Sequence, residues 1–150
     1  MIERYEERLA AASGEAEEAG LGGIVVTPSP DLVYLTGYDP PPPERLTMLV
    51  VAPRSQPVLL VPELERPRAL DSPLGERLEV TAWADGEDPY AAAARVLSPE
   101  GTYGVTDRMW ASHVIGLQRE LPGDRPPRRA QSRCACRVGQ PVGAQIATGA

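Results

Sequence analysis

The chain has 150 residues, of which 42% are hydrophobic and 24% charged, so it is long enough for one domain with a sizeable core and too short for two full ones. Its net charge of −6 is unevenly spread: residues 1–123 carry 20 acidic residues and 10 arginines, whereas residues 124–150 carry one acidic residue and five arginines. An acidic body argues against a nucleic-acid partner.

The N-terminus and the cysteines set the expected compartment. The start MIERYEERLA is too charged for a signal peptide, and no apolar run approaches the roughly 20 residues that cross a bilayer. The two cysteines, Cys134 and Cys136, provide no disulfide framework. We therefore expect a cytoplasmic protein without a membrane partner.

The first half of the chain alternates helical and β-branched apolar segments. Apolar residues recur at helical spacing near the N-terminus, and Gly20 is suited to end that helix in a left-handed conformation. Two apolar runs separated by Pro53-Arg54-Ser55-Gln56 are typical of an antiparallel hairpin. The predicted elements are a helix at 2–19, a strand at 23–27, hairpin strands at 46–52 and 57–62, and a helical turn at 63–70 that Pro67 keeps short.

The second half predicts two more strands, each followed by a helix. The strands are residues 78–83 and 102–106. Asp88 should cap the helix at 90–97, with Pro89 in its first turn. The last helix is predicted from an apolar stripe of Trp110, Val114, Leu117 and Leu121.

The stretch VYLTGY, residues 33–38, lies between the first strand and the hairpin and precedes four consecutive prolines. It predicts a short helical turn closed by Gly37, with Val33 and Leu35 in the core. The prolines favour extended geometry, so the segment from Tyr38 through Arg45 is expected to project as a stiff loop.

These elements predict an α/β fold, a mixed β-sheet flanked by helices. The strand residues Val25, Leu49, Leu60, Val80 and Val105 are expected to be buried in one sheet. Residues 124–150 have Val138, Val142 and Ile146 as their sizeable aliphatic residues, so we expect an irregular tail that leaves the last sheet position unfilled. Its composition is that of a GC-rich gene read out of frame.

Three groups of residues are of types that bind metal ions, and each has a simpler structural explanation. His113 lacks partners for a metal site and fits the edge of the last helix's apolar stripe. Cys134 and Cys136 suit a soft metal but have no third ligand nearby. The acidic loop of Asp85, Glu87 and Asp88 lacks the alternating pattern of a calcium loop, and capping of the next helix explains Asp88.

Five segments occur in an order that resembles the N-terminal domain of the creatinase/prolidase family of metallopeptidases. They are EAGLGGIVVT, PSPDLVYLTGY, LVVAPRSQPVLLVP, EVTAWADGEDPY and TYGVTDRMW, and together they span about residues 4–123. The most specific piece is YLTGY at 34–38, which is similar to the family's YLTGF with Tyr for the final Phe.

The resemblance implies a domain that performs no chemistry itself. In this family the N-terminal domain takes part in the dimer and lends a loop to the rim of a neighbouring active site, a role that would fall here to Tyr38, Asp39, Glu44 and Arg45. A second domain holds two divalent metal ions of the Mn, Co or Zn type through two Asp, one His and two Glu. No such ligand set occurs in this sequence, so we expect no metal cofactor and no activity of the isolated chain.

We therefore interpret residues 1–123 as an N-terminal domain of this family and residues 124–150 as a tail left by truncation or frameshift. The expected partner is a second copy of the chain or a catalytic domain of the same family. Two alternatives stay open: a subunit that completes a separately encoded catalytic domain in trans, and a free-standing dimerisation or ligand-binding module.

Overall fold

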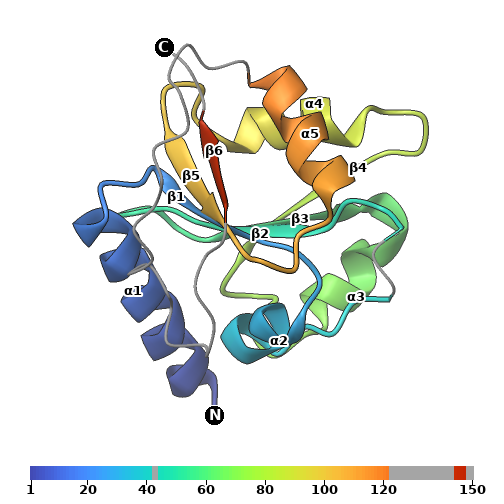
Figure 1. Cartoon of the computed structure of the whole chain (residues 1–150). Coiled ribbons are helices and arrows are strands. Elements are labelled where there is room, and N and C mark those ends of the chain that lie inside the picture. Colours follow the sequence, from blue (N-terminus) through green and yellow to red (C-terminus); the bar gives the residue numbers. More distant parts are fainter. Residues whose placement is uncertain (42–43, 122–143, 148–150) are drawn as a thin grey trace.

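The computed structural model describes residues 1–41 and 44–121 in full, together with the backbone of residues 144–147. Five helices and six strands follow one another in these ranges, with one 3₁₀ turn (Figure 1). Their bounds are α1 Ile2–Glu18, β1 Gly23–Val26, α2 Pro30–Thr36, β2 Met48–Val51, β3 Val58–Pro62, the 3₁₀ turn Glu63–Glu65, α3 Arg66–Leu70, β4 Glu79–Trp83, α4 Pro89–Val96, β5 Thr102–Val105, α5 Ala111–Glu120 and β6 Ala144–Ala147.

The strands form one mixed sheet in the order β4-β3-β2-β1-β5-β6. β1, β2 and β3 are consecutive antiparallel neighbours, whereas β4 joins β3 and β5 joins β1 in parallel. Parallel neighbours need a crossover connection, and here α3 and α4 lie on the crossovers. The predicted mixed sheet and its hairpin are confirmed.

Helices cover both faces of the sheet, which gives three layers (Figure 1). α1, α2 and α3 pack on one face, where their apolar residues meet Ile24, Leu49 and Leu59. α4 and α5 pack on the other face over Val25 and Leu60. Neighbouring strand residues thus enter opposite cores, because successive side chains of a strand point to opposite faces.

The predicted core strand residues all lie in strands of this one sheet. Val25, Leu49, Leu60 and Val105 are buried, with at most 1% of their surface exposed. Val80 is only half-buried, because β4 is the end strand of the sheet and has a neighbour on one side only in the described part of the chain.

Helix ends follow the sequence signals. Ser29 caps α2 through its hydroxyl oxygen, which accepts from the backbone N–H of Leu32 at 3.4 Å, and Asp88 caps α4 by accepting from Tyr90 N–H at 2.8 Å. Gly37 ends α2 at φ 72°, in the left-handed region that glycine adopts without strain. α2 is a true helix of two turns, so the predicted turn in VYLTGY extends back to Pro30.

Two predicted core positions are wrong. Val33 on α2 is 37% exposed, because the buried face of that helix is formed by Leu32, Leu35 and Thr36. Trp110 is 49% exposed because it precedes α5 as its N-cap residue.

The predicted stripe is otherwise confirmed, since Leu117 and Leu121 are buried and Val114 packs against the same core, and His113 and Gly116 join them on the inward face of α5. At Gly116 the ring of Tyr90 occupies the space where a side chain would stand, since an added Cβ would lie 2.4 Å from Tyr90 Cζ. The Tyr90 ring fills this contact from α4, which is why apolar spacing did not single out Gly116 as part of the buried face.

The expectation that the tail leaves the last sheet position unfilled is also wrong. β6 pairs antiparallel with β5, in a register that sets Thr102 opposite Ala147 and Val105 opposite Ala144. Backbone hydrogen bonds, which do not depend on large apolar side chains, suffice to add this strand. The other predicted features of the tail, residues 124–143 and both cysteines included, lie outside the described residues.

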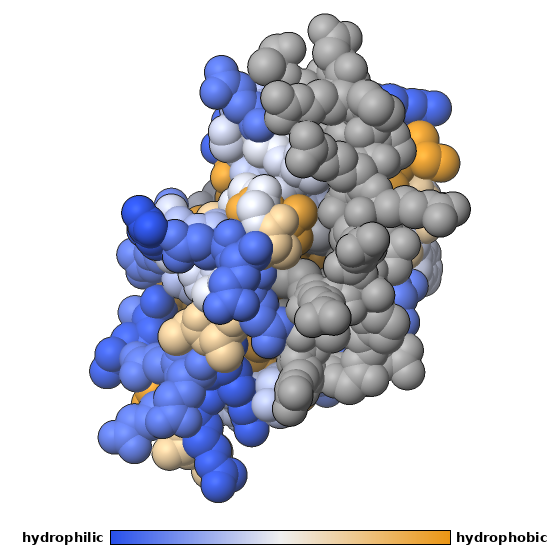
Figure 2. All heavy atoms as spheres, turned by 60° about the vertical axis from the view of Figure 1, so that its left-hand side comes forward, coloured by the Kyte–Doolittle hydropathy of each residue, from blue (hydrophilic) through white to orange (hydrophobic). Residues whose placement is uncertain are grey.

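The outer surface of α1 is mainly hydrophilic, with small apolar patches among the described residues seen in this view (Figure 2). α1 buries Leu9, Ala12 and Ala16 against the sheet. In the described part of the chain, no helix has the length and apolar character needed to cross a membrane.

Candidate functional site

The loop between α2 and β2 is fixed at its start by the end of α2. The Thr36 hydroxyl donates to the Leu32 carbonyl oxygen at 2.7 Å and accepts from the backbone N–H of Tyr38 at 3.0 Å. The left-handed Gly37 turns the chain so that the Tyr38 ring enters the core, where it is 1% exposed. The loop thus begins from a buried anchor.

Burial changes the acidity of that anchor. It raises the pKa of the Tyr38 phenol to about 12, with a smaller rise from the negative charge of Glu65 and a partial offset from Arg68. Among the described residues the buried phenol oxygen has no hydrogen-bond partner. Tyr38 therefore holds the loop from inside the domain, and its side chain is not at the surface where a rim residue would stand.

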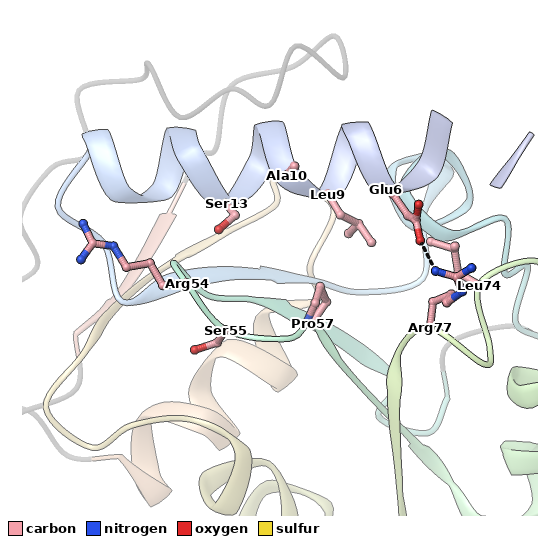
Figure 3. A pocket seen from close by; sticks show the side chains of 9 residues that line it. All are labelled: Glu6, Leu9, Ala10, Ser13, Arg54, Ser55, Pro57, Leu74 and Arg77. Atoms are coloured by element: carbon pink, nitrogen blue, oxygen red, sulfur yellow. Dashed lines mark hydrogen bonds and ion pairs between the residues drawn. The ribbon is translucent and has the colours of Figure 1, made fainter. Parts of the chain in front are cut away.

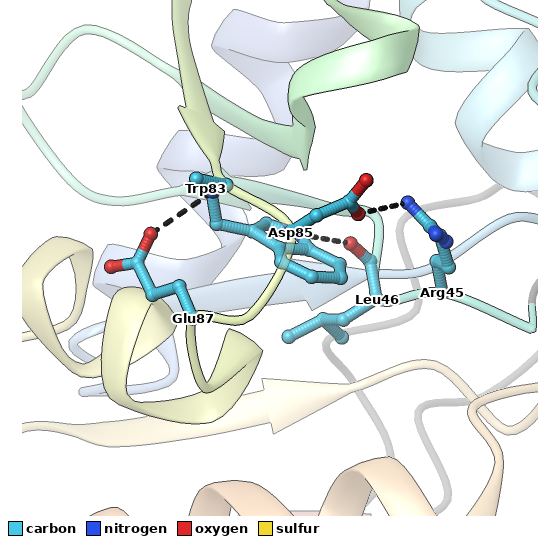
Figure 4. Close-up of polar contacts among 6 residues, drawn as sticks. Arg45, Leu46, Trp83, Asp85 and Glu87 are labelled. Atoms are coloured by element: carbon cyan, nitrogen blue, oxygen red, sulfur yellow. Dashed lines mark hydrogen bonds and ion pairs between the residues drawn. The ribbon is translucent and has the colours of Figure 1, made fainter.

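The far end of the loop is fixed by Trp83, the last residue of β4. Its indole Nε1 donates a buried hydrogen bond of 2.9 Å to the carbonyl oxygen of Leu46 (Figure 4). Leu46 and Thr47 are themselves buried and lead into β2. Buried residues, Tyr38 and Leu46, thus bound the loop at its two ends.

Polar side chains gather where this segment meets the turn after β4 (Figure 4). Arg45 Nη1 lies 2.6 Å from Asp85 Oδ1, and both side chains are at least half exposed. Glu87 holds the turn itself, since its Oε2 accepts from the backbone N–H of Ala84 at 3.1 Å and its Oε1 pairs with Arg95. Hydrogen bonds from Arg95 and from Ala84 hold the pKa of Glu87 below its usual range.

The loop and the end of β3 line a small pocket of about 130 Å³. It is lined by Pro41, Glu44, Arg45, Thr47, Pro62 and Glu65. Pockets that hold a whole small-molecule ligand are larger, about 300–1,000 Å³. This hollow can therefore supply part of a binding surface and not a complete site.

The predicted site residues are only partly brought together. Glu44 and Arg45 line the same pocket, and Asp39 is exposed at the start of the loop, whereas Tyr38 is in the core. Sequence reasoning did not identify Trp83 or the pairing role of Asp85. No local signal could have found them, because they lie 37 and 40 residues away from Leu46 and Arg45.

The described residues do not fit the pair of metal ions that the family resemblance implies. Within residues 1–41 and 44–121 no three His, Cys, Asp or Glu side chains come together in a group that could hold a metal ion. His113 is buried between Trp110, whose ring stacks on it at 5.9 Å, and Tyr90, whose hydroxyl lies 3.1 Å from Nδ1. Its contacts are those of a packed core residue.

The fold is that of a three-layer α/β domain with a loop between α2 and β2 that is anchored by the buried residues Tyr38 and Leu46. The family model of the creatinase/prolidase N-terminal domain matches residues 8–126. Since this match covers most of the sequence, the chain belongs to the creatinase/prolidase N-terminal domain family.

Named relatives agree with this family. Two proteins described as probable dipeptidase PepE, from Mycobacterium bovis and Mycobacterium tuberculosis, are each 42% identical over 122 residues, which is 79% of this chain and 32% of theirs. The chain thus spans about a third of the length of the curated relatives that it matches.

Solved structures show the same fold. The crystal structure of dipeptidase PepE from Mycobacterium ulcerans superposes with a TM-score of 0.74 at 38% identity, covering 80% of this chain and 33% of that one. The creatinase/prolidase N-terminal domain of an X-Pro dipeptidase from Streptococcus pyogenes gives a TM-score of 0.66 at 25% identity, covering 75% and 92%. The predicted fold class is confirmed.

Proposed function

We propose that this chain is the non-catalytic N-terminal domain of an Xaa-Pro peptidase-like metallohydrolase, and that residues 39–45 shape the rim of an active site contributed by another domain. The observation that carries the proposal is the loop's construction. Tyr38 and Leu46 are buried anchors at its two ends, while Asp39, Glu44 and Arg45 between them are exposed. A loop held in this way offers its polar groups to a partner at little entropic cost.

The relatives' names support the hydrolase part of the proposal. They are described as dipeptidases, and this chain matches about a third of their length. The chemistry would then be done by metal ions held in the part of such an enzyme that lies outside the match. The chain's own contribution would be positional: Glu44 and Arg45 would meet the end of a bound peptide, and Asp85 would hold Arg45 in place.

The partner is either a second copy of the chain or a catalytic domain, joined to it or supplied in trans. A rim role requires such a partner, because the 130 Å³ pocket is too small to enclose a dipeptide. The cytoplasmic location is part of the same proposal. A free-standing dimerisation module is the remaining alternative.

Activity of the isolated chain is the first test. The purified chain, supplied with Mn²⁺ or Co²⁺, should not hydrolyse Xaa-Pro dipeptides above background. Metal-dependent turnover that persists through further purification would contradict a non-catalytic role.

The rim role is tested by joining residues 1–121 to the remainder of the M. tuberculosis relative. In this fusion Arg45→Ala should raise KM for a dipeptide more than it lowers kcat, since the loop is proposed to bind and not to react. Arg119→Ala, a change of the same kind on exposed α5, is the matched control and should leave both constants unchanged. Equal effects of the two variants would refute the rim role and leave the family membership intact.

A further inference from the structure

The outer edge of β4 carries backbone groups that pair with no other strand in the described part of the chain. β4 ends the sheet on one side, where β3 is its parallel neighbour. The backbone N–H of Glu79 donates to the Pro57 carbonyl oxygen at 3.1 Å, so the backbone groups of Glu79 are directed toward β3. Backbone groups alternate in direction along a strand, and those of Val80 and Ala82 are therefore directed away from the sheet.

The chain itself satisfies the next outward donors at both ends of β4. Before the strand, the Leu78 N–H donates to the Leu74 carbonyl oxygen at 3.0 Å. After the strand, the Ala84 N–H donates to Glu87 Oε2 at 3.1 Å (Figure 4). The outward N–H groups that remain are those of residues 80 and 82, and no hydrogen bond reaches them from the described part of the chain.

The charged side chains that flank β4 are held away from this edge. Arg77, before the strand, is directed toward α1, where its Nη1 lies 2.9 Å from Glu6 Oε1 (Figure 3). Asp85, after the strand, pairs with Arg45. Residues 80–82 remain partly exposed. Many proteins protect an edge strand with a lysine or a proline, and β4 contains neither.

The two outward residues select one register for pairing with a second copy of β4. In an antiparallel pair, two opposite residues can exchange both of their backbone hydrogen bonds. Val80 opposite Ala82 of the second copy, and Ala82 opposite its Val80, form two such pairs, which use every outward group of both residues in four hydrogen bonds. A register shifted in either direction would need the N–H of Leu78 or of Ala84, and both are already bonded.

The side chains of β4 are compatible with this register. Thr81 falls on the two-fold axis, opposite Thr81 of the second copy, in the kind of pair whose Cα atoms are about 4.5 Å apart and whose hydroxyls can hydrogen-bond. Glu79, the one charged residue of β4, comes opposite Trp83. No like charges therefore face each other within the strand, and the same surface serves on both copies, as a two-fold interface requires.

We infer that two copies of this chain associate edge to edge through β4, antiparallel and with Thr81 on the two-fold axis, so that their sheets join into one. The proposed function leaves open which surface a second copy would occupy. The inference names that surface and does not rest on the rim role of residues 39–45. Because the ladder is short, we expect a weak dimer that forms at high concentration.

The experiment combines sedimentation of the full chain at increasing concentration with amide hydrogen exchange. The average mass should rise from that of one chain toward that of two. Exchange at Val80 and Ala82 should slow with concentration, by about fivefold where about four-fifths of the chain is dimeric, because only the monomer exposes these N–H groups. The Thr81 N–H faces β3 and is the internal control, which should change less than about twofold.

Variants at the axis separate pairing from folding. Thr81→Lys places two positive charges opposite each other and should weaken association about fivefold or more, and Thr81→Glu should do the same. A mixture of these two variants brings opposite charges together and should restore association. Gln118→Lys, on an exposed position of α5, is the matched control and should associate as the native chain does. Ala82→Pro removes an outward donor and no bond to β3, so it should abolish association in a folded chain.

Three results would overturn the inference. One is a single-chain mass at every concentration up to about 1 mM. Another is association that leaves exchange at Val80 and Ala82 unchanged, or that survives in a folded Ala82→Pro chain, since the dimer would then use a different surface. The third is slow exchange at both residues in the dilute chain, which would mean that another segment of the same chain covers the edge. None of these results affects the tests of the rim, which measure KM and kcat of the Arg45→Ala fusion.

Discussion

The indole nitrogen of Trp83 and the carbonyl oxygen of Leu46 are joined by a buried hydrogen bond of 2.9 Å, although 37 residues separate them in the sequence. This bond connects the end of β4, the outermost strand on its side of the sheet, to the end of the loop that carries Glu44 and Arg45. The position of the proposed rim loop therefore depends on the edge of the sheet.

Trp83→Phe should lower the free energy of unfolding by about 1–3 kcal/mol, because it leaves the buried Leu46 carbonyl without its donor. Chemical denaturation measures the change. Trp110→Phe, at a ring that is 49% exposed, is the control and should shift stability by less than about 0.5 kcal/mol. Equal losses in the two variants would show that the hydrogen bond contributes nothing.

Leu60→Ala should cost about 2–5 kcal/mol, since Leu60 is fully buried between β3 and the α4 and α5 layer and truncation leaves a cavity. The same substitution at Leu64, which is 79% exposed, should be nearly neutral. Urea unfolding of both variants gives the comparison. A loss well under 1 kcal/mol at Leu60 would mean that β3 is misplaced.

Two glycines with positive φ allow backbone strain to be separated from crowding. At Gly86, with φ 90°, an added Cβ meets nothing within 4 Å, so Gly86→Ala should cost only the left-handed penalty of about 1–2 kcal/mol. At Gly37, with φ 72°, it would lie 2.7 Å from Pro73 Cγ and 3.0 Å from Tyr5 Oη. Gly37→Ala should therefore cost roughly 1–3 kcal/mol more. Thermal unfolding measures the stability lost by each variant. Equal losses would contradict the prediction that crowding adds to the cost at Gly37.

Tyr38 predicts a loss of stability in alkali. An unfolded tyrosine titrates near pH 10, about the reference value, whereas burial raises the pKa of Tyr38 to about 12. Between these values the unfolded chain has released the proton and the folded chain retains it, so the free energy of unfolding falls as the pH rises. Below pH 10 this residue adds no pH dependence.

Tyr38→Phe checks this by denaturation at several pH values. The variant should be at least as stable as the native chain at pH 7, because the phenol oxygen has no hydrogen-bond partner among the described residues. It should lose less stability than the native chain between pH 10 and 12. Tyr103, whose pKa burial also raises, is present in both proteins, so their difference isolates Tyr38. If the native chain and Tyr38→Phe lost the same stability between pH 10 and 12, Tyr38 would not be the source of the alkaline destabilisation.

Much of the fold could be predicted because its signals are local. Helical spacing located α1, the Asp88-Pro89 pair located the start of α4, and Gly37 marked the end of α2. The hairpin followed from two apolar runs around a proline-containing turn. Caps, turns and periodicity act over a few residues, so the sequence contains them directly.

Only the tertiary structure decided which side chains of VYLTGY are buried and what holds the loop that follows. Val33 faces outward and Tyr38 enters the core because α2 packs against α1 and the sheet in one orientation, which two helical turns with apolar residues on several sides do not specify. The Arg45–Asp85 pair and the Trp83–Leu46 bond join segments about 40 residues apart. Such contacts depend on the order of strands in the sheet, and strand order is set by the packing of the whole domain and not by any local spacing.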